Sequence, residues 1–132
     1  MIFVDTSAII ALEVPSDLFH KKALKWRKEA KDPIFVSSNL VFIETTSWVR
    51  HNSGKEIAVK LGLSLLSGAG IQIERVISDD ENNAWALFQK IEGRGISMID
   101  CTSFVLMKRL KIKEVFAFDS DFKKLGFKVH PS

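Results

Sequence analysis

Short apolar runs recur along this chain, and segments with helical periodicity separate each run from the next. The runs are residues 2–4, 34–36, 71–73, 115–118 and 127–129. Strands that are apolar on both sides and joined by helices belong in a parallel sheet that helices cover on both faces. The alternation therefore predicts an α/β fold, arranged as a three-layer α/β/α sandwich.

The expected helices lie between these runs. Apolar periodicity and capping residues place them at about residues 6–12, 18–31, 39–51, 55–66, 79–91 and 98–110, with a turn or short helix at 119–124. With 132 residues, 46% of them hydrophobic, we expect one domain spanning 1–132. In such sheets a ligand site lies at the carboxyl ends of the strands, beside a topological switch point.

Charge and cysteine content say less about function. Nineteen Lys and Arg against sixteen Asp and Glu give a net charge of +3, which favours a polyanionic partner without identifying one. Cys101 is the single cysteine, so no disulfide forms within the chain, which fits a reducing compartment. The apolar start carries Asp5 and Glu13, so we expect neither a signal peptide nor a membrane anchor, and a cytoplasmic protein.

Four acidic residues are placed to meet at one edge of the predicted sheet. Asp5 directly follows the first apolar run, and Asp119 closes the run at 115–118. Asp100 lies in the first turn of a helix that begins after Ser97, and Glu44 lies about two turns into the helix after the second run. We expect all four carboxylates to reach the carboxyl edge of the strands.

Each aspartate also has a purely structural explanation. Asp5 and Asp119 could cap the helices that follow them, and Ser97 with Asp100 matches a capping box. Asp121 is close enough to Asp119 to serve as an additional metal ligand. Other acids are interpreted as surface or capping residues, namely Asp17, Asp79 and Asp80.

Glu44 is harder to explain as a structural residue. Its helical neighbours Leu40, Val41 and Trp48 place it on an apolar stripe that should face inward. A buried carboxylate needs a partner, and no Lys or Arg lies three or four residues away in either direction. The partner must then be distant in sequence or a metal ion.

Carboxylates gathered at one edge repel one another, and without a cation some would have to take up protons. A divalent cation removes this conflict. Oxygen-only ligands suit Mg²⁺ or Mn²⁺, and Mg²⁺ is commonly bound by few carboxylates together with substrate phosphate. The constellation therefore points to metal-dependent hydrolysis of phosphodiester bonds.

Four sequence segments resemble the motifs of PIN domains, and in order and spacing they are most similar to VapC-type toxins. The segments read FVDTSAIIAL, NLVFIETTSWV, SMIDCTSFVLMKRL and VFAFDSDFKKLGF, and together they cover essentially the whole chain. The resemblance implies a PIN-like fold with a five-stranded parallel sheet between helices. It also implies an RNA substrate, a cognate antitoxin protein and a homodimer.

The resemblance assigns roles to particular residues. The family's acidic positions fall on Asp5, Glu44, Asp100 and Asp119, and its small hydroxyl residue after the first acid falls on Thr6, which we expect to position substrate. Family members commonly have Thr or Ser two residues before the last acid, where this chain has Ala117. At this position the chain therefore lacks the hydroxyl that the family pattern places near its last acid, Asp119.

The sequence thus predicts a Mg²⁺- or Mn²⁺-dependent endoribonuclease that acts as the toxin of a toxin–antitoxin pair. The alternatives are an RNA-processing nuclease without an antitoxin, or a non-catalytic module that binds RNA or protein. Chemistry based on a nucleophile is disfavoured, since Cys101 lies in an apolar helix and no serine lies in a GxSxG motif.

The remaining charged and aromatic residues receive simpler interpretations. Groups of Lys and Arg are expected to be solvated helix faces, with a minority near the acidic edge contacting RNA phosphates. Three tryptophans have helical spacings to other apolar residues, which favours packing in the core or a dimer over base stacking: Trp26, Trp48 and Trp85.

Overall fold

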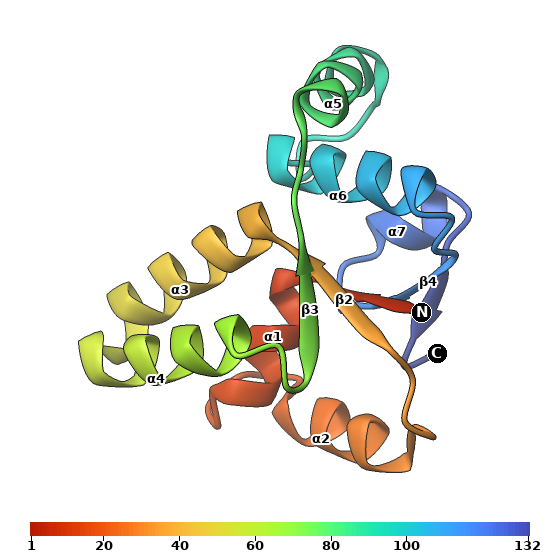
Figure 1. Ribbon diagram of the computed structural model, residues 1–132. Helices are drawn as coiled ribbons and strands as arrows, with labels where there is room; N and C mark the ends of the chain where they lie inside the picture. The colour runs from red at the N-terminus through yellow and green to blue at the C-terminus, as the bar shows by residue number, and fades with distance from the viewer.

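Five parallel strands form one central sheet, in the order β3-β2-β1-β4-β5 (Figure 1). The computed structural model describes residues 1–132. The strands are β1 (Ile2–Val4), β2 (Phe35–Ser38), β3 (Ile71–Glu74), β4 (Glu114–Phe116) and β5 (Lys128–His130). The predicted α/β architecture with a five-stranded parallel sheet is confirmed.

The fourth strand is shorter than expected. β4 ends at Phe116, so Ala117 and Phe118 belong to the loop that follows, and Asp119 does not close a strand. Both residues are apolar because other parts of the molecule cover them. Ala117 is buried, and the Phe118 ring stacks on Phe19 with ring centroids 4.6 Å apart.

Seven helices flank the sheet. They are α1 (Thr6–Glu13), α2 (His20–Glu29), α3 (Asn39–Ser53), α4 (Lys55–Leu66), α5 (Ser78–Lys90), α6 (Met98–Arg109) and α7 (Asp121–Lys124). Figure 1 shows α1, α2 and α4 on one side of the sheet and α6 and α7 on the other, so that the sheet is the middle of three layers. No helix is both long and apolar enough to cross a membrane.

Apolar side chains from both faces of the sheet form the core. On one face, Trp26 of α2 packs against the rings of Phe35 and Phe116, with centroids 6.2 and 4.4 Å away. On the other, Phe104 of α6 meets Phe122 of α7 edge to face at 4.9 Å. β1 lies at the centre of the sheet, and its residues are buried throughout.

The α3–α4 pair and helix α5 extend away from the sheet (Figure 1). α3 and α4 form an antiparallel pair joined at Gly54, whose φ of 97° only glycine adopts without strain. α5 packs on α6, at a distance from the strands. Trp48 on α3 and Trp85 on α5 are exposed, so neither packs in the core, and their packing in a dimer stays a prediction. Trp26 is partly buried and packs against the core, as expected.

Asp80 departs from its interpretation as a surface or capping residue. It does cap α5, since its carboxylate accepts a hydrogen bond from the Ile77 amide at 3.0 Å. However, it is only 1% exposed, and it forms an ion pair with Arg109 at 2.8 Å. The charge is tolerated in the interior because the guanidinium balances it.

The order of the strands creates a switch point. The chain passes from β1 through β2 to β3 and then returns to the opposite side of β1, where it adds β4 and β5. The connections that leave β1 and β4 therefore diverge at the carboxyl ends of these two strands. Ligand sites in open parallel sheets lie at this position, and here Asp5 follows β1 while residues 117–120 follow β4.

Candidate metal centre

Asp5 is the most enclosed acid at the switch point. It caps the N-terminus of α1, where its Oδ2 accepts hydrogen bonds from the Ser7 amide at 3.2 Å and the Ser7 hydroxyl at 2.6 Å. The residue is only 5% exposed. Burial raises the pKa of Asp5 from 3.8 to about 7, and the carboxylates of Asp100 and Asp119 also raise it, against the lowering effect of Ser7.

Ser7 joins this acid to the loop after β4. While its hydroxyl donates to Asp5, the same oxygen accepts a hydrogen bond from the Phe118 amide at 3.0 Å. Phe118 directly precedes Asp119, so one hydroxyl fixes both the first acid and the backbone that carries the last one. The sequence interpretation did not single out Ser7, although its position two residues after a helix-capping aspartate was a usable signal.

Asp100 is held at the N-terminus of α6. Its carboxylate accepts a hydrogen bond from the Ser97 amide at 2.9 Å, and its own amide donates to the Ser97 hydroxyl at 3.0 Å. The capping box expected from the sequence is therefore present, and it orients the acid at the same time. Burial raises the pKa of Asp100 above its ordinary value, and the nearby Asp121 carboxylate raises it further.

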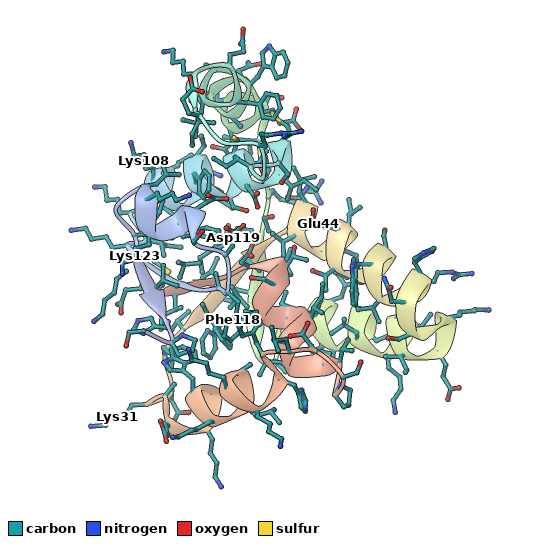
Figure 2. All side chains as sticks on the ribbon, turned by 180° about the vertical axis from the view of Figure 1, so that it is seen from behind. Lys31, Glu44, Lys108, Phe118, Asp119 and Lys123 are labelled. Carbon is teal, nitrogen blue, oxygen red and sulfur yellow. The ribbon has the colours of Figure 1, made fainter.

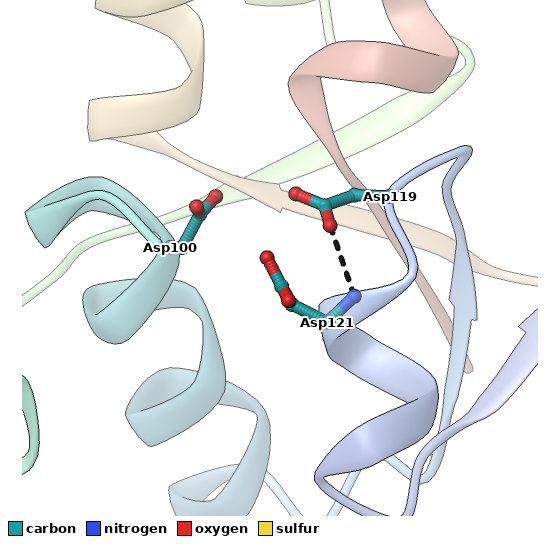
Figure 3. A group of neighbouring side chains, drawn as sticks. All are labelled: Asp100, Asp119 and Asp121. Carbon is teal, nitrogen blue, oxygen red and sulfur yellow. Dashed lines mark hydrogen bonds between the residues drawn. The ribbon is translucent and has the colours of Figure 1, made fainter. Parts of the chain in front are cut away.

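Asp100, Asp119 and Asp121 form a group in which one carboxylate oxygen from each residue lies within 4.8 Å of the others. Figure 3 shows the three side chains converging from α6, the loop after β4 and the start of α7. The Asp121 amide donates to Asp119 Oδ1 at 2.9 Å, which fixes the last acid. Burial raises the pKa of Asp119, and the carboxylates of Asp121 and Asp100 raise it as well.

This group has little positive charge to balance it. Its one ion pair joins Asp121 to Lys124 at 3.5 Å, and the Lys124 side chain is largely exposed. Raised pKa values at Asp5, Asp100 and Asp119 show the cost of bringing these charges together. Several carboxylate oxygens with a net negative charge are a donor set that fits a hard divalent cation.

Glu44 lies apart from the three converging aspartates. It is half-buried in the second turn of α3 and takes no part in any ion pair (Figure 2). α3 contacts α6, the helix that carries Asp100. The prediction that Glu44 lies on an inward-facing apolar stripe is only partly confirmed, because Trp48, one turn after Glu44, is exposed.

Thr6 is buried, and its hydroxyl has no hydrogen-bond partner within the protein. The structural hydrogen bonds next to Asp5 come from Ser7 instead. Cys101 is also buried, and burial raises the pKa of its thiol, which fits a packed residue rather than a nucleophile.

A five-stranded parallel sheet with an acidic group at its switch point places carboxylates that can hold a divalent cation where such sheets bind their ligands. The sequence matches the PIN domain family over residues 2–128. The chain therefore belongs to the PIN-domain family, and its relatives are of the VapC type.

The relatives cover nearly all of the chain. It is 36% identical over 128 residues to the 23S rRNA-specific endonuclease VapC20 of Mycobacterium tuberculosis strains CDC 1551 / Oshkosh and ATCC 25618 / H37Rv, with 96% of this chain and 95% of the relative aligned. The crystal structure of M. tuberculosis VapC20, described as a sarcin-ricin loop cleaving toxin, superposes with a TM-score of 0.88 and 33% identity. It covers 96% of both chains.

Proposed function

We propose that this protein is a Mg²⁺- or Mn²⁺-dependent endoribonuclease. The observation that carries the proposal is the convergence of Asp100, Asp119 and Asp121 within 4.8 Å at the switch point of a PIN fold. Asp5 lies buried beside them, close enough for its pKa to respond to Asp100 and Asp119. The name of the relative, an rRNA-specific endonuclease, supports RNA as the substrate class.

The acids that would hold the cation are Asp5, Asp100, Asp119 and Asp121 at the carboxyl edge of the sheet. Glu44, which lies apart from the converging aspartates, would join them from α3, the helix that contacts α6. A divalent cation in such a site lowers the pKa of bound water and stabilises charge on phosphate oxygens. The chain's contribution is rigid placement of its carboxylates, through the Ser97 amide at Asp100 and the Asp121 amide at Asp119. We assign substrate positioning to Thr6, whose hydroxyl has no partner in the protein.

The biological role that we propose is that of a toxin, with residues 1–132 as one PIN domain. A relative described as a toxin that cleaves the sarcin-ricin loop supports this role. The proposal includes a cognate antitoxin that blocks the site, a homodimer, and action in the cytoplasm, where the buried free thiol of Cys101 would stay reduced.

The decisive experiment is RNA cleavage by purified protein with Mg²⁺ or Mn²⁺, compared with the same protein in EDTA. We expect cleavage only with metal, and expect it to be lost in Asp100→Asn. The matched control is Asp79→Asn, which removes an exposed carboxylate in the first turn of α5. Metal-independent cleavage, or equal loss in both variants, would contradict the proposal.

The toxin role needs a separate test in cells. Induced expression of the wild type should arrest bacterial growth, and Asp100→Asn should not, at equal protein level. Growth arrest by both variants would separate toxicity from hydrolysis and overturn this part of the proposal.

A further inference from the structure

A groove of about 480 Å³ opens beside the acidic group. Its walls come from the start of α2, the loop after β4, α7, β5 and the two residues after β5. Asp119 lines this groove and also belongs to the group of converging carboxylates. The groove therefore borders the candidate metal centre at Asp119. Figure 2 labels three residues that line it, Phe118, Asp119 and Lys123.

Three lysines from three separate elements line the groove: Lys22 of α2, Lys123 of α7 and Lys128 of β5. All three are exposed, and Lys22 and Lys123 form no ion pair. Lys128 has only a long contact to Glu114 at 3.9 Å. Their positive charges are available to a ligand, and the ligand they favour is a polyanion.

Aromatic side chains complete the groove. Phe19 and Phe118 stack with ring planes 7° apart, and both line it. The Phe19 residue keeps 37% of its surface exposed. Lysines along a groove with an accessible aromatic ring are the combination by which proteins hold single-stranded nucleic acid, through phosphates and base stacking.

We propose that this groove binds a single-stranded RNA segment adjacent to the scissile phosphate. Phosphates of that segment contact Lys22, Lys123 and Lys128, and a base packs against Phe19. The inference rests on the proposed ribonuclease function and adds the path of the substrate to it. Because Asp119 lies in both the groove and the metal centre, RNA held here would lead directly into the carboxylate group.

The test is binding of a short fluorescein-labelled single-stranded RNA, measured by fluorescence anisotropy in EDTA at about 50 to 200 mM salt. The triple variant Lys22→Gln, Lys123→Gln, Lys128→Gln should bind about tenfold or more weakly at the low end of this range. Each phosphate contact on a single strand contributes about 0.7 to the slope of log K against log salt. The slope of the triple variant should therefore be smaller by about two.

The control removes the same charge elsewhere, with Lys55→Gln, Lys60→Gln and Lys90→Gln. These exposed lysines lie on α4 and α5, outside the groove. We expect the control to keep the wild-type slope. Equal affinity and slope for wild type and the groove variant would overturn the proposal, as would an equal loss in the control.

Two further outcomes are informative. A groove variant that binds RNA normally but loses affinity for a poly-glutamate peptide would assign the groove to an acidic protein segment and overturn the RNA proposal. Because binding is measured without metal, a wild type that binds RNA through these lysines but never cleaves it would refute the ribonuclease proposal alone.

Discussion

Asp80 and Asp100 occupy the same position in two helices that pack together, yet their surroundings differ. Each lies in the first turn of its helix and accepts a hydrogen bond from the amide three residues earlier, at Ile77 and Ser97 respectively. At Asp80 the neighbour is Arg109, which donates from Nε at 2.8 Å and from a terminal nitrogen at 2.9 Å. At Asp100 the neighbours are the carboxylates of Asp119 and Asp121.

The pKa values move in opposite directions as a result. Hydrogen bonds from Arg109 hold the pKa of Asp80 below its ordinary value, whereas burial and Asp121 raise that of Asp100. The local sequence pattern, an acid at the start of a helix, is the same in both. The comparison teaches that the charge of the side chains around the carboxylate, and not its capping role, separates a structural acid from a candidate metal ligand.

The largest expected effect is on activity. Asp100→Asn should lower kcat/KM for RNA cleavage by about 10³-fold, because a lost cation ligand removes several kcal/mol of charge stabilisation. Asp80→Asn should stay within about threefold of wild type when assayed well below its unfolding temperature. Initial-rate kinetics with Mn²⁺ measure both. Similar losses in the two variants would erase the distinction drawn between the two aspartates.

The next effect is on stability. Arg109→Gln should lower the free energy of unfolding, because it leaves the buried carboxylate of Asp80 without its counter-charge. The Arg109 side chain is 38% exposed, so solvent screens part of this effect. Urea unfolding followed by circular dichroism measures it. The neighbouring exposed Lys108→Gln is the control and should change stability by less than about 0.5 kcal/mol.

The free energy of unfolding should also depend on pH, because the acids of the candidate metal centre have raised pKa values. Between pH 3.8 and about 7 the folded protein holds a proton on Asp5 that the unfolded chain has released. The free energy of unfolding in EDTA should therefore fall as pH rises from 5 to 8, by roughly 2 kcal/mol. The raised pKa values of Asp100 and Asp119 act in the same direction.

Urea unfolding at several pH values tests this window. Asp5→Asn or excess Mg²⁺ should flatten the profile. Asp80 behaves oppositely, because its pKa is lower in the folded protein than in the unfolded chain. Its stabilising contribution is present at a pH above the unfolded-state pKa and is lost as the pH falls through the folded-state pKa. A profile that rises with pH between 5 and 8 would contradict the burial of an uncompensated Asp5.

The smallest effect is expected at Ser7. Ser7→Ala removes the donor to Asp5 and leaves the Phe118 amide without its acceptor. We expect kcat/KM to fall about tenfold, equivalent to about 1.4 kcal/mol, with the acidic limb of the pH profile moved to higher pH. Ser7→Thr keeps a hydroxyl and should recover most of the activity. Equal losses in both variants, without a shift of the profile, would indicate a packing role only.

The sequence pattern predicts the sheet well because buried parallel strands and amphipathic helices have distinct periods. It fails at Ala117 and Phe118, which are apolar because distant side chains cover them and not because they lie in a strand. No local pattern distinguishes these two causes. Asp119 consequently reaches the site from a loop rather than from the end of a strand.

Within the site, the sequence predicts which segments meet, but it does not predict which side chains form hydrogen bonds or ion pairs. Strand order brings Asp5 and the loop after β4 together, as the sequence indicated. The hydrogen bond from the Phe118 amide to the Ser7 hydroxyl joins residues 111 positions apart, so the sequence near either residue does not predict it. The same holds for Asp80, whose guanidinium partner lies 29 residues away.

Asp119 lies both in the groove and in the acidic group, so the proposed cation and the proposed RNA ligand would be thermodynamically interdependent. A cation that neutralises this carboxylate removes a repulsion from any phosphate in the adjoining groove. Reciprocity then requires that bound RNA raise the affinity for the cation by the same factor that the cation raises the affinity for RNA. Cation and RNA should therefore bind cooperatively. At a low concentration of divalent cation the free protein should bind each of them weakly, whereas protein that has bound one of them should bind the other more tightly.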